Sequence, residues 1–291
     1  MFKQAWYTSS KKHVQTSCTK EISMENNIKL VAVDVDGTFV RSDYSYDTER
    51  FQKILSKMKA CGCHFVVASG NQYYQLRDLF PGYYDELSFV AENGGFVKDK
   101  KEVVFTADIP KETVDQVIDI CREYHPEIRN IVCGLHSAYC ERGTVDQDFF
   151  DLTKIYYHRL KWVDDFKEID DQILKFAPSV PDKKTYDYYD MFRERLGGKI
   201  EPTTSGHGSV DLILPGCHKA SGLKRLVERW NITPEQCVAF GDGGNDIEML
   251  QYCGQSFAMD NAPQNVKDAA KHVCPSNDED GVLVTLDRIF E

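Results

Sequence analysis

The stretch LVAVDVDGT, residues 30–38, determines the fold class expected of this chain. Its first four residues, Leu30 to Val33, are apolar, which is typical of a strand buried on both faces. Asp34 and Asp36 come directly after them, at the carboxyl end of the strand, where open α/β sheets bind ligands. Two acids one residue apart in an extended chain point to the same side. Their repulsion favours a cation-binding site over the alternative, a solvated turn.

Outward from this strand, apolar strand-like segments alternate with amphipathic helical segments. The alternation occurs at both ends of the chain and is the βαβ pattern of a parallel sheet with helices on its faces. It predicts one Rossmann-like α/β domain built from the two ends. The expected elements are strands at 30–33, 65–68 and 237–240 and helices at 49–60, 219–230 and 246–253.

The middle of the chain predicts a different, α+β domain. Turn residues interrupt the pattern near 108–110 and 215–216, so we expect an insert at 109–215 between core segments 28–108 and 216–291. Residues 1–27 show no periodic apolar face and are expected to be a disordered extension. The elements expected within the insert are helices at 111–124, 146–156 and 183–196 and strands at 129–133, 173–176, 199–203 and 210–214.

Composition and charge exclude several classes of function. The formal net charge is -11 at pH 7, whereas nucleic acids and anionic membranes demand a basic surface. The sequence has no apolar run of the roughly 18 residues that span a membrane, which predicts a cytoplasmic protein. The ten cysteines include no CxxC spacing, so we expect reduced, structural cysteines and no zinc site. Nothing in the sequence specifies an oligomeric state.

A second acidic segment, GDGGND at 241–246, also follows an apolar strand and precedes a helix. Asp242, Asn245 and Asp246 offer oxygen ligands, which suit Mg²⁺ together with water and a substrate phosphate. For the glycines alone, the alternative is an ordinary turn. Combined with the acidic pair at 34–36, the segment predicts an Mg²⁺ site.

Two further segments are suited to bind phosphate. Ser69-Gly70-Asn71 lies between the second strand and a helix, where a hydroxyl and backbone N–H groups favour an anion. Its alternative interpretation is an ordinary helix N-cap. Lys219 begins a helix, where the helix dipole opposes a cation. That unfavourable position indicates a functional lysine rather than a surface one.

Taken in order, these segments resemble the haloacid dehalogenase superfamily, and within it the Cof-type phosphatases, closest to the Cof-type sugar phosphatases. The matching segments are DVDGT at 34–38, Ser69, FVAENGG at 89–95, Lys219, GDGGND at 241–246 and FAMDNA at 257–262, with 68–76, 133–139 and 157–160 pointing to the sugar-phosphatase subgroup. The resemblance covers about 29–291. It implies a Rossmann-like core with an inserted α+β cap domain of the C2 type.

The resemblance also implies a role for each matching residue. Asp34 is the nucleophile and Asp36 the general acid and base. Mg²⁺ is held by Asp34 and Asp242 and by the backbone carbonyl of Asp36. Asp246 orients the site. The residues that hold phosphate or substrate are Thr38, Ser69, Gly70, Asn71, Lys219 and Asn245. Many Cof-type relatives carry arginine at the position of Asn71, so this chain departs from them there.

The insert supplies His136, Tyr139 and His158 as candidates for substrate recognition, with packing or solvation of the cap as their alternative role. The resemblance implies an Mg²⁺-dependent phosphatase that hydrolyses small phosphate monoesters, sugar phosphates above all, through a phosphorylated Asp34. A phosphotransferase or mutase is one alternative, and a non-catalytic sensor phosphorylated on aspartate is another. Asp36 favours turnover, because a long-lived phosphoaspartate needs no acid/base group.

Overall fold

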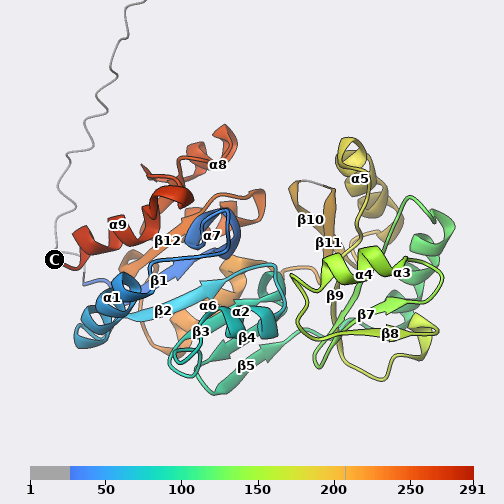
Figure 1. Ribbon diagram of the computed structural model, residues 1–291, viewed down its shortest axis with the longest axis horizontal. Helices are drawn as coiled ribbons and strands as arrows, with labels where there is room; N and C mark the ends of the chain where they lie inside the picture. The colour runs from blue at the N-terminus through green and yellow to red at the C-terminus, as the bar shows by residue number, and fades with distance from the viewer. Residues whose placement is uncertain (1–26, 207) are drawn as a thin grey trace, which may run out of the picture.

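Two β-sheets organise the chain and lie side by side in Figure 1. The structure, a computed structural model, describes residues 27–206 and 208–291. The extension expected at 1–27 therefore falls outside the described residues, except for residue 27 itself. We call the eight-stranded sheet the core sheet and the six-stranded sheet the cap sheet.

The core sheet is built from both ends of the chain, as the βαβ alternation predicts. Its order is β14-β13-β12-β1-β2-β3-β4-β5, with β14 to β3 parallel and β4 and β5 antiparallel. The strands are β1 (Leu30–Val33), β2 (His64–Ala68), β3 (Ser88–Ala91), β4 (Phe96–Asp99), β5 (Glu102–Thr106), β12 (Cys237–Gly241), β13 (Gln255–Met259) and β14 (His272–Cys274). Because β1 pairs with β12 on one side and β2 on the other, the sheet has a switch point at β1.

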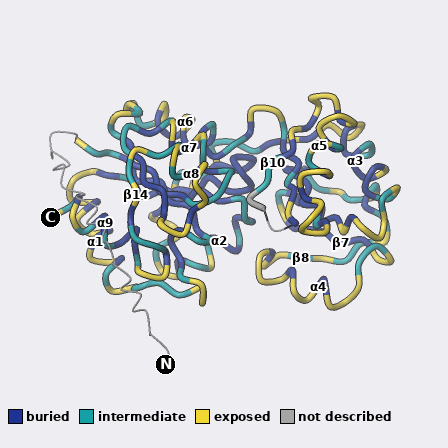
Figure 2. The backbone as a smooth tube through the Cα atoms, turned by 90° about the horizontal axis from the view of Figure 1, so that it is seen from above, coloured by how far each residue is buried: buried dark blue, intermediate teal, exposed yellow. Residues whose placement is uncertain are grey.

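Helices cover both faces of the core sheet. One face carries α1 (Thr48–Ala60), α2 (Tyr73–Leu79) and α9 (Gly281–Ile289), and the other carries α6 (Lys219–Arg229), α7 (Ile247–Tyr252) and α8 (Gln264–Ala269). Within β1, Val31 and Val33 pack toward the first group of helices, and Leu30 and Ala32 toward the second. Both faces of β1 are therefore buried, which explains its unbroken apolar sequence and the buried strands at the centre of Figure 2.

The cap sheet has the order β10-β11-β9-β6-β7-β8. Its strands are β6 (Val132–Gly134), β7 (Ala138–Glu141), β8 (Leu160–Val163), β9 (Ile173–Phe176), β10 (Glu201–Gly206) and β11 (Ser209–Ile213). Helices α3 (Lys111–Glu123) and α5 (Thr185–Leu196) pack on one face, and α4 (Gln147–Thr153) on the other. In β9, Phe176 packs with α3 and α5, so its neighbour Lys175 points to the α4 side.

The architecture confirms the expected fold class, a Rossmann-like α/β core with an inserted α+β cap. Most of the elements expected from the sequence occur within one to three residues of their predicted ends. The strands not expected from the sequence are β7 and β8 of the cap and β3, β4, β5, β13 and β14 of the core. Segments such as Leu-Lys-Trp-Val at 160–163 are short and mix polar with apolar residues, so periodicity does not identify them. The nine described cysteines are all free, and eight of them are buried. Among the described residues, no helix has the length and apolar character needed to cross a membrane.

Candidate active site

The switch point brings Asp34 and Lys219 into direct contact. Asp34 follows β1, and Lys219 is the first residue of α6, which packs behind the sheet. The Lys219 Nζ donates to Asp34 Oδ1 and to Asp246 Oδ1, each at 2.6 Å. All three side chains are buried, so the lysine carries its charge into a region with little water. The two ion pairs place the charge of Lys219 beside Asp34, and its functional role stays a prediction.

Asp242 and Asp246 join the site from the loop after β12, the strand next to β1. Asp246 Oδ2 accepts from the backbone N–H groups of Asp242 and Gly243, at 3.1 and 2.9 Å, which holds the loop in shape. Thr38 Oγ1 donates to Asp242 Oδ1 at 2.7 Å. Gly37 is needed beside them, since a Cβ there would lie 2.4 Å from Asp242 Oδ2. In this structure Thr38 orients Asp242, a contact that the phosphate-binding role expected of it did not include.

Carboxylates of the site resist ionisation. Burial raises the pKa of Asp34 well above its ordinary value, against the lowering effect of Lys219. Burial, together with the charge of Asp246, raises the pKa of Asp242 to about 6. For Lys219, burial lowers the pKa, but the charges of Asp246 and Asp34 outweigh it and raise the pKa overall. The raised pKa values show that one lysine does not offset the cost of ionising all of these buried carboxylates.

The same carboxylates form a group that fits a divalent cation. Asp34, Asp242 and Asp246 each offer an oxygen, and these oxygens lie within 4.8 Å of one another. A hard cation with oxygen ligands, such as Mg²⁺, matches this donor set and offsets the cost of ionising these carboxylates. From the sequence we expected Asp34, the backbone carbonyl of Asp36 and Asp242 as ligands, with Asp246 orienting the site. The structure adds the carboxylate of Asp246 to the group, and the Asp36 carbonyl stays a prediction.

Asp36 is tied to the segment after β2. Asn71 Nδ2 donates to Asp36 Oδ2 at 2.6 Å, while Asp36 Oδ1 has no hydrogen bond to any described residue. Burial raises the pKa of Asp36 above its ordinary value, which favours the protonated, donating form. Ser69 Oγ accepts from the Asn71 N–H at 3.1 Å, and the N-cap of α2 is Gln72. Asn71 therefore orients the acid/base candidate, and Ser69 is not the helix cap of the alternative interpretation.

A second buried lysine joins the cap to the core. Lys175 Nζ donates to the Gly70 carbonyl at 2.7 Å and to Asp211 Oδ2 at 2.8 Å, and lies 3.3 Å from Glu92 Oε2. Asp211 Oδ2 also accepts from Asn93 Nδ2 at 2.6 Å. We call Lys175, Asp211 and Glu92 the cap–core cluster. It fixes the cap against the loop that the sequence predicts to bind phosphate.

Asn245 belongs to the same network. Its Nδ2 donates to Asn93 Oδ1 at 3.0 Å, and Asn93 in turn donates to Asp211 of the cap. The residue expected to touch phosphate is thus oriented through a chain of hydrogen bonds that ends on β11. Asn93 has a φ of 52°, a left-handed conformation that Asn tolerates better than most residues.

A cavity of about 870 Å³ lies above Asp34, between the core and the α4 side of the cap sheet. Residues of the core that line it are Asp34, Asp36, Gly37, Tyr44, Ser69, Gly70, Asn71, Asn93, Asp242, Asn245 and Asn261. From the cap, the lining includes Arg129, Ile131, Phe149, Leu152, Tyr156, Tyr157, Lys175, Ala177 and Asp211. The catalytic candidates therefore open into a cavity of ligand size.

The structure does not bring His136, Tyr139 or His158 to this cavity. The backbone N–H of His136, in the turn between β6 and β7, and the hydroxyl of Tyr139, in β7, both donate to Asp171, at 3.0 and 2.8 Å. His158 Nδ1 lies 2.9 Å from Asp78 Oδ2 at the outer edge of α2. The contacts of His136 and Tyr139 stay within the cap, as in the alternative packing role, whereas His158 contacts helix α2 of the core. None of the three residues lines the cavity.

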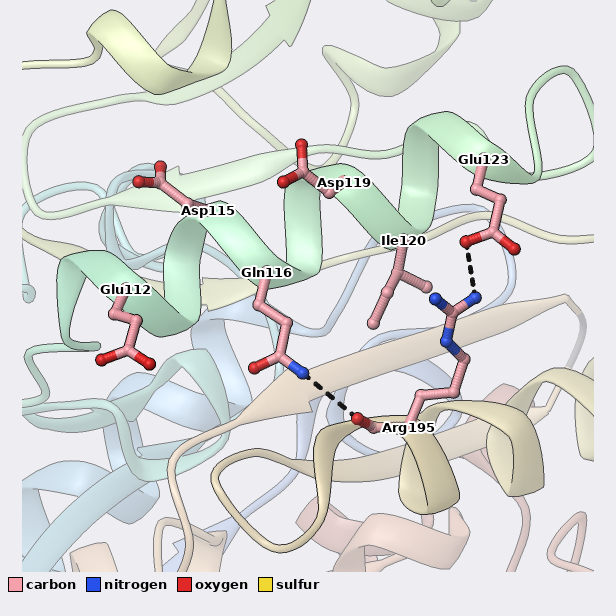
Figure 3. Close-up of a pocket in the computed structure, with 7 residues that line it drawn as sticks. All are labelled: Glu112, Asp115, Gln116, Asp119, Ile120, Glu123 and Arg195. Atoms are coloured by element: carbon pink, nitrogen blue, oxygen red, sulfur yellow. Dashed lines mark hydrogen bonds and ion pairs between the residues drawn. The ribbon is translucent and has the colours of Figure 1, made fainter.

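A second hollow, of about 480 Å³, lies on the cap between α3 and α5 (Figure 3). Four carboxylates line it, Glu112, Asp115, Asp119 and Glu123, against one arginine, Arg195. Such a lining repels a phosphate dianion. The cavity above Asp34 is therefore the candidate substrate site.

Comparisons with known proteins agree with this geometry. Residues 31–286 match the family of haloacid dehalogenase-like hydrolases. The chain is 43% identical over 265 residues to the 5-amino-6-(5-phospho-D-ribitylamino)uracil phosphatase YbjI of Escherichia coli, covering 91% of this chain and 97% of that one. The phosphatase YitU of Bacillus subtilis, named for the same substrate, is 26% identical over 92% of this chain and 99% of its own. The crystal structure of a Streptococcus mutans protein has a TM-score of 0.86 at 36% identity, over 89% of this chain and 98% of that chain.

The chain belongs to the haloacid dehalogenase-like hydrolases. Within this family it is a phosphoric monoester hydrolase, of the Cof type that its sequence resembles.

Sequence reasoning missed the residues that connect the two parts of this hydrolase. Lys175 lies within the apolar run Ile-Leu-Lys-Phe at 173–176, and a lysine inside a buried strand is itself a signal that the charge has a partner. Asp211 likewise interrupts the apolar positions of β11. Neither signal identifies the residues that pair with the charge, because the partners of Lys175 come from three separate segments of the chain.

Proposed function

We propose that this hydrolase is an Mg²⁺-dependent phosphatase for small phosphate monoesters of sugars or sugar alcohols, and that it works through a phosphorylated Asp34. The observation that carries the proposal is the buried pair of Asp34 and Lys219, 2.6 Å apart, at the floor of the cavity. The lysine orients the carboxylate and offsets the repulsion between it and a phosphate dianion. A nucleophile placed against a cation in this way suits attack on phosphorus.

The reaction proceeds in two steps. An oxygen of Asp34 forms a bond to phosphorus while the bond from phosphorus to the alcohol oxygen breaks, and Asp36 gives its proton to that oxygen. Asp36 then takes a proton from a water molecule, whose oxygen attacks the phosphorus and releases Asp34 and inorganic phosphate. The hydrogen bond from Asn71 keeps Asp36 in position for both steps.

Asp34, Asp242 and Asp246 would hold the metal ion. When bound, Mg²⁺ neutralises charge on the phosphoryl oxygens and helps to align them. Thr38 and the loop that Asp246 organises keep Asp242 in place for that purpose.

The names of two relatives support a sugar-alcohol phosphate as substrate. Both YbjI and YitU are named as phosphatases of 5-amino-6-(5-phospho-D-ribitylamino)uracil, in which the phosphate sits on a five-carbon ribityl chain. The cavity has room for a ligand of that size, and Asn71 and Asp211 in its lining offer polar groups to hydroxyls. This compound is therefore the first substrate to test, ahead of hexose phosphates.

The test measures phosphate release from a set of monoesters by the purified protein, with Mg²⁺ and with chelator. We expect turnover only with Mg²⁺, and a loss of orders of magnitude in Asp34→Asn. Asp164→Asn, which changes an exposed carboxylate of the cap, is the matched control and should keep full activity. Metal-independent turnover, or an Asp34→Asn variant with more than about a tenth of wild-type kcat, would refute the proposal. Excess acceptor sugar distinguishes hydrolysis from phosphoryl transfer.

A further inference from the structure

Helix α4 and the turn after it carry apolar side chains on two sides, and only one side is fully covered by the cap sheet. Phe150 stacks on Trp162 with 4.3 Å between ring centroids, which fastens the helix to the sheet. Phe149 and Leu152 lie three residues apart on a second side of the helix, and Tyr156 follows in the turn after α4. That second side lines the cavity above Asp34.

Phe149 is buried, but the other two side chains of this second side lie in water. Leu152 is 64% exposed and Tyr156 is 41% exposed, although both are large and apolar. Tyr44 of the core, also 41% exposed, lies across from them, and its hydroxyl is 3.2 Å from that of Tyr156. Exposed apolar side chains gathered around one cavity mark a binding surface. Hydroxyls of a bare sugar phosphate gain little from such a surface, because they lose water there without finding partners.

Arg129 extends the same surface. Its guanidinium carbon lies 4.4 Å from the centre of the Phe149 ring, and it forms no ion pair with any residue of 27–206 or 208–291. A guanidinium stacked on a ring is planar and keeps its N–H donors free at the edge. Donors of this kind match the carbonyl oxygens and ring nitrogens of a heterocycle.

We infer that Phe149, Leu152, Tyr156 and Arg129, together the α4 wall, receive a planar nitrogen heterocycle carried by the alcohol part of the substrate. The substrate class is then a phosphorylated polyol that bears a ring, and the α4 wall selects it over the bare polyol phosphate. Apolar ring contacts come from α4, and edge hydrogen bonds come from Arg129. The inference rests on the proposed function, since it places the phosphate of the same molecule at Asp34.

The experiment compares two esters that differ only by the ring, ribitol 5-phosphate and 5-amino-6-(5-phospho-D-ribitylamino)uracil. Each is assayed with wild type, Leu152→Ser and Arg129→Gln, which change exposed side chains and therefore leave the cap core intact. Tyr186→Ser, an equally exposed apolar residue of α5 outside the cavity, is the matched control.

Wild type should prefer the ring-bearing ester in kcat/KM. Each α4 wall variant should lower that preference about three- to tenfold, the range expected for a lost ring contact or hydrogen bond. Hydrolysis of ribitol 5-phosphate should stay within about twofold of wild type, and Tyr186→Ser should change neither ester.

Calorimetric titration of Asp34→Asn with the dephosphorylated product, 5-amino-6-(D-ribitylamino)uracil, measures the ring contact without catalysis. Binding that weakens in Asp34→Asn/Leu152→Ser supports the inference. Equal losses of kcat/KM for both esters in the α4 wall variants would overturn the inference. So would product binding that Leu152→Ser leaves unchanged. Either result would leave the proposed chemistry at Asp34 unaffected. Wild type that hydrolyses neither ester but binds the product would instead overturn the proposed function alone.

Discussion

Lys219 in the core and Lys175 in the cap are both buried lysines, with 1% and 2% of their surface exposed. Each lies between carboxylates, and in each case those carboxylates raise the lysine pKa although burial lowers it. The partners of Lys219, Asp34 and Asp246, both belong to the core. Those of Lys175 belong to both parts of the molecule, because Gly70 and Glu92 lie in the core and Asp211 in the cap.

The difference shows that burial and ion pairing do not by themselves reveal the role of a charged residue. Lys219 lies at the switch point of the core sheet and touches the carboxylate that we propose as nucleophile, so its charge acts on the reaction. Lys175 touches a backbone carbonyl and carboxylates that take no part in the proposed chemistry. Its charge therefore acts on the position of the cap.

Replacing Lys219 should give the largest effect on turnover. Lys219→Met removes the cation beside Asp34, and we expect kcat to fall about 100- to 1000-fold for every phosphate ester, because electrostatic stabilisation in a buried site is lost. Steady-state kinetics on two unrelated esters checks that the fall is the same for both. Lys224→Met, on the exposed side of the same helix, should keep wild-type kcat. A loss restricted to one ester would assign Lys219 to substrate selection instead.

Replacing Lys175 should chiefly affect stability. Lys175→Met leaves Asp211 and Glu92 buried without their cation, and breaking a buried pair costs about 3 kcal/mol or more of unfolding free energy. The double variant Lys175→Met/Glu92→Gln should regain part of that loss, because one unpaired charge is removed. Urea unfolding measures both. Lys184→Met, whose ion pair is half exposed, should cost less than about 1 kcal/mol. A single variant as stable as wild type would contradict the role of the cap–core cluster.

The smallest effect concerns the pH dependence of stability at Glu92. Burial raises the pKa of Glu92 from its ordinary 4.5 to about 7, although Lys175 opposes the rise. Because the folded protein then binds this proton more tightly than the unfolded chain, the contribution of Glu92 to the unfolding free energy is highest below pH 4.5 and falls as the pH rises to 7. The difference in unfolding free energy between wild type and Glu92→Gln should follow this slope and level off above pH 7. A difference independent of pH would show that Glu92 titrates normally.

The sequence predicted the core of the site because that part depends on local pattern. Asp34 and Asp242 each follow an apolar strand, and neighbouring parallel strands deliver their carboxyl ends to one edge of the sheet. The contacts of Asn71 with Asp36 and of Thr38 with Asp242 could not be predicted from the sequence, because they depend on side-chain directions in irregular loops.

The cap shows the opposite case. Its two helix-bearing faces and most of its strands follow from periodicity. The residues chosen for recognition, His136, Tyr139 and His158, nevertheless do not line the cavity. Which face of the cap sheet meets the core is decided by contacts between distant segments, such as Lys175 with Gly70. Periodicity shows that a strand has two faces but does not show which one meets the substrate.

The covalent phosphoenzyme tests the central claim most directly. Asp36→Asn should slow hydrolysis of the intermediate while p-nitrophenyl phosphate, whose leaving group needs no proton, still loads it. Rapid acid quench followed by peptide mass spectrometry should then find one phosphoryl group, sensitive to hydroxylamine, on the peptide that contains Asp34. Asp34→Asn/Asp36→Asn should carry none. A phosphoryl group on another residue, or none at any time during turnover by Asp36→Asn, would contradict nucleophilic catalysis by Asp34.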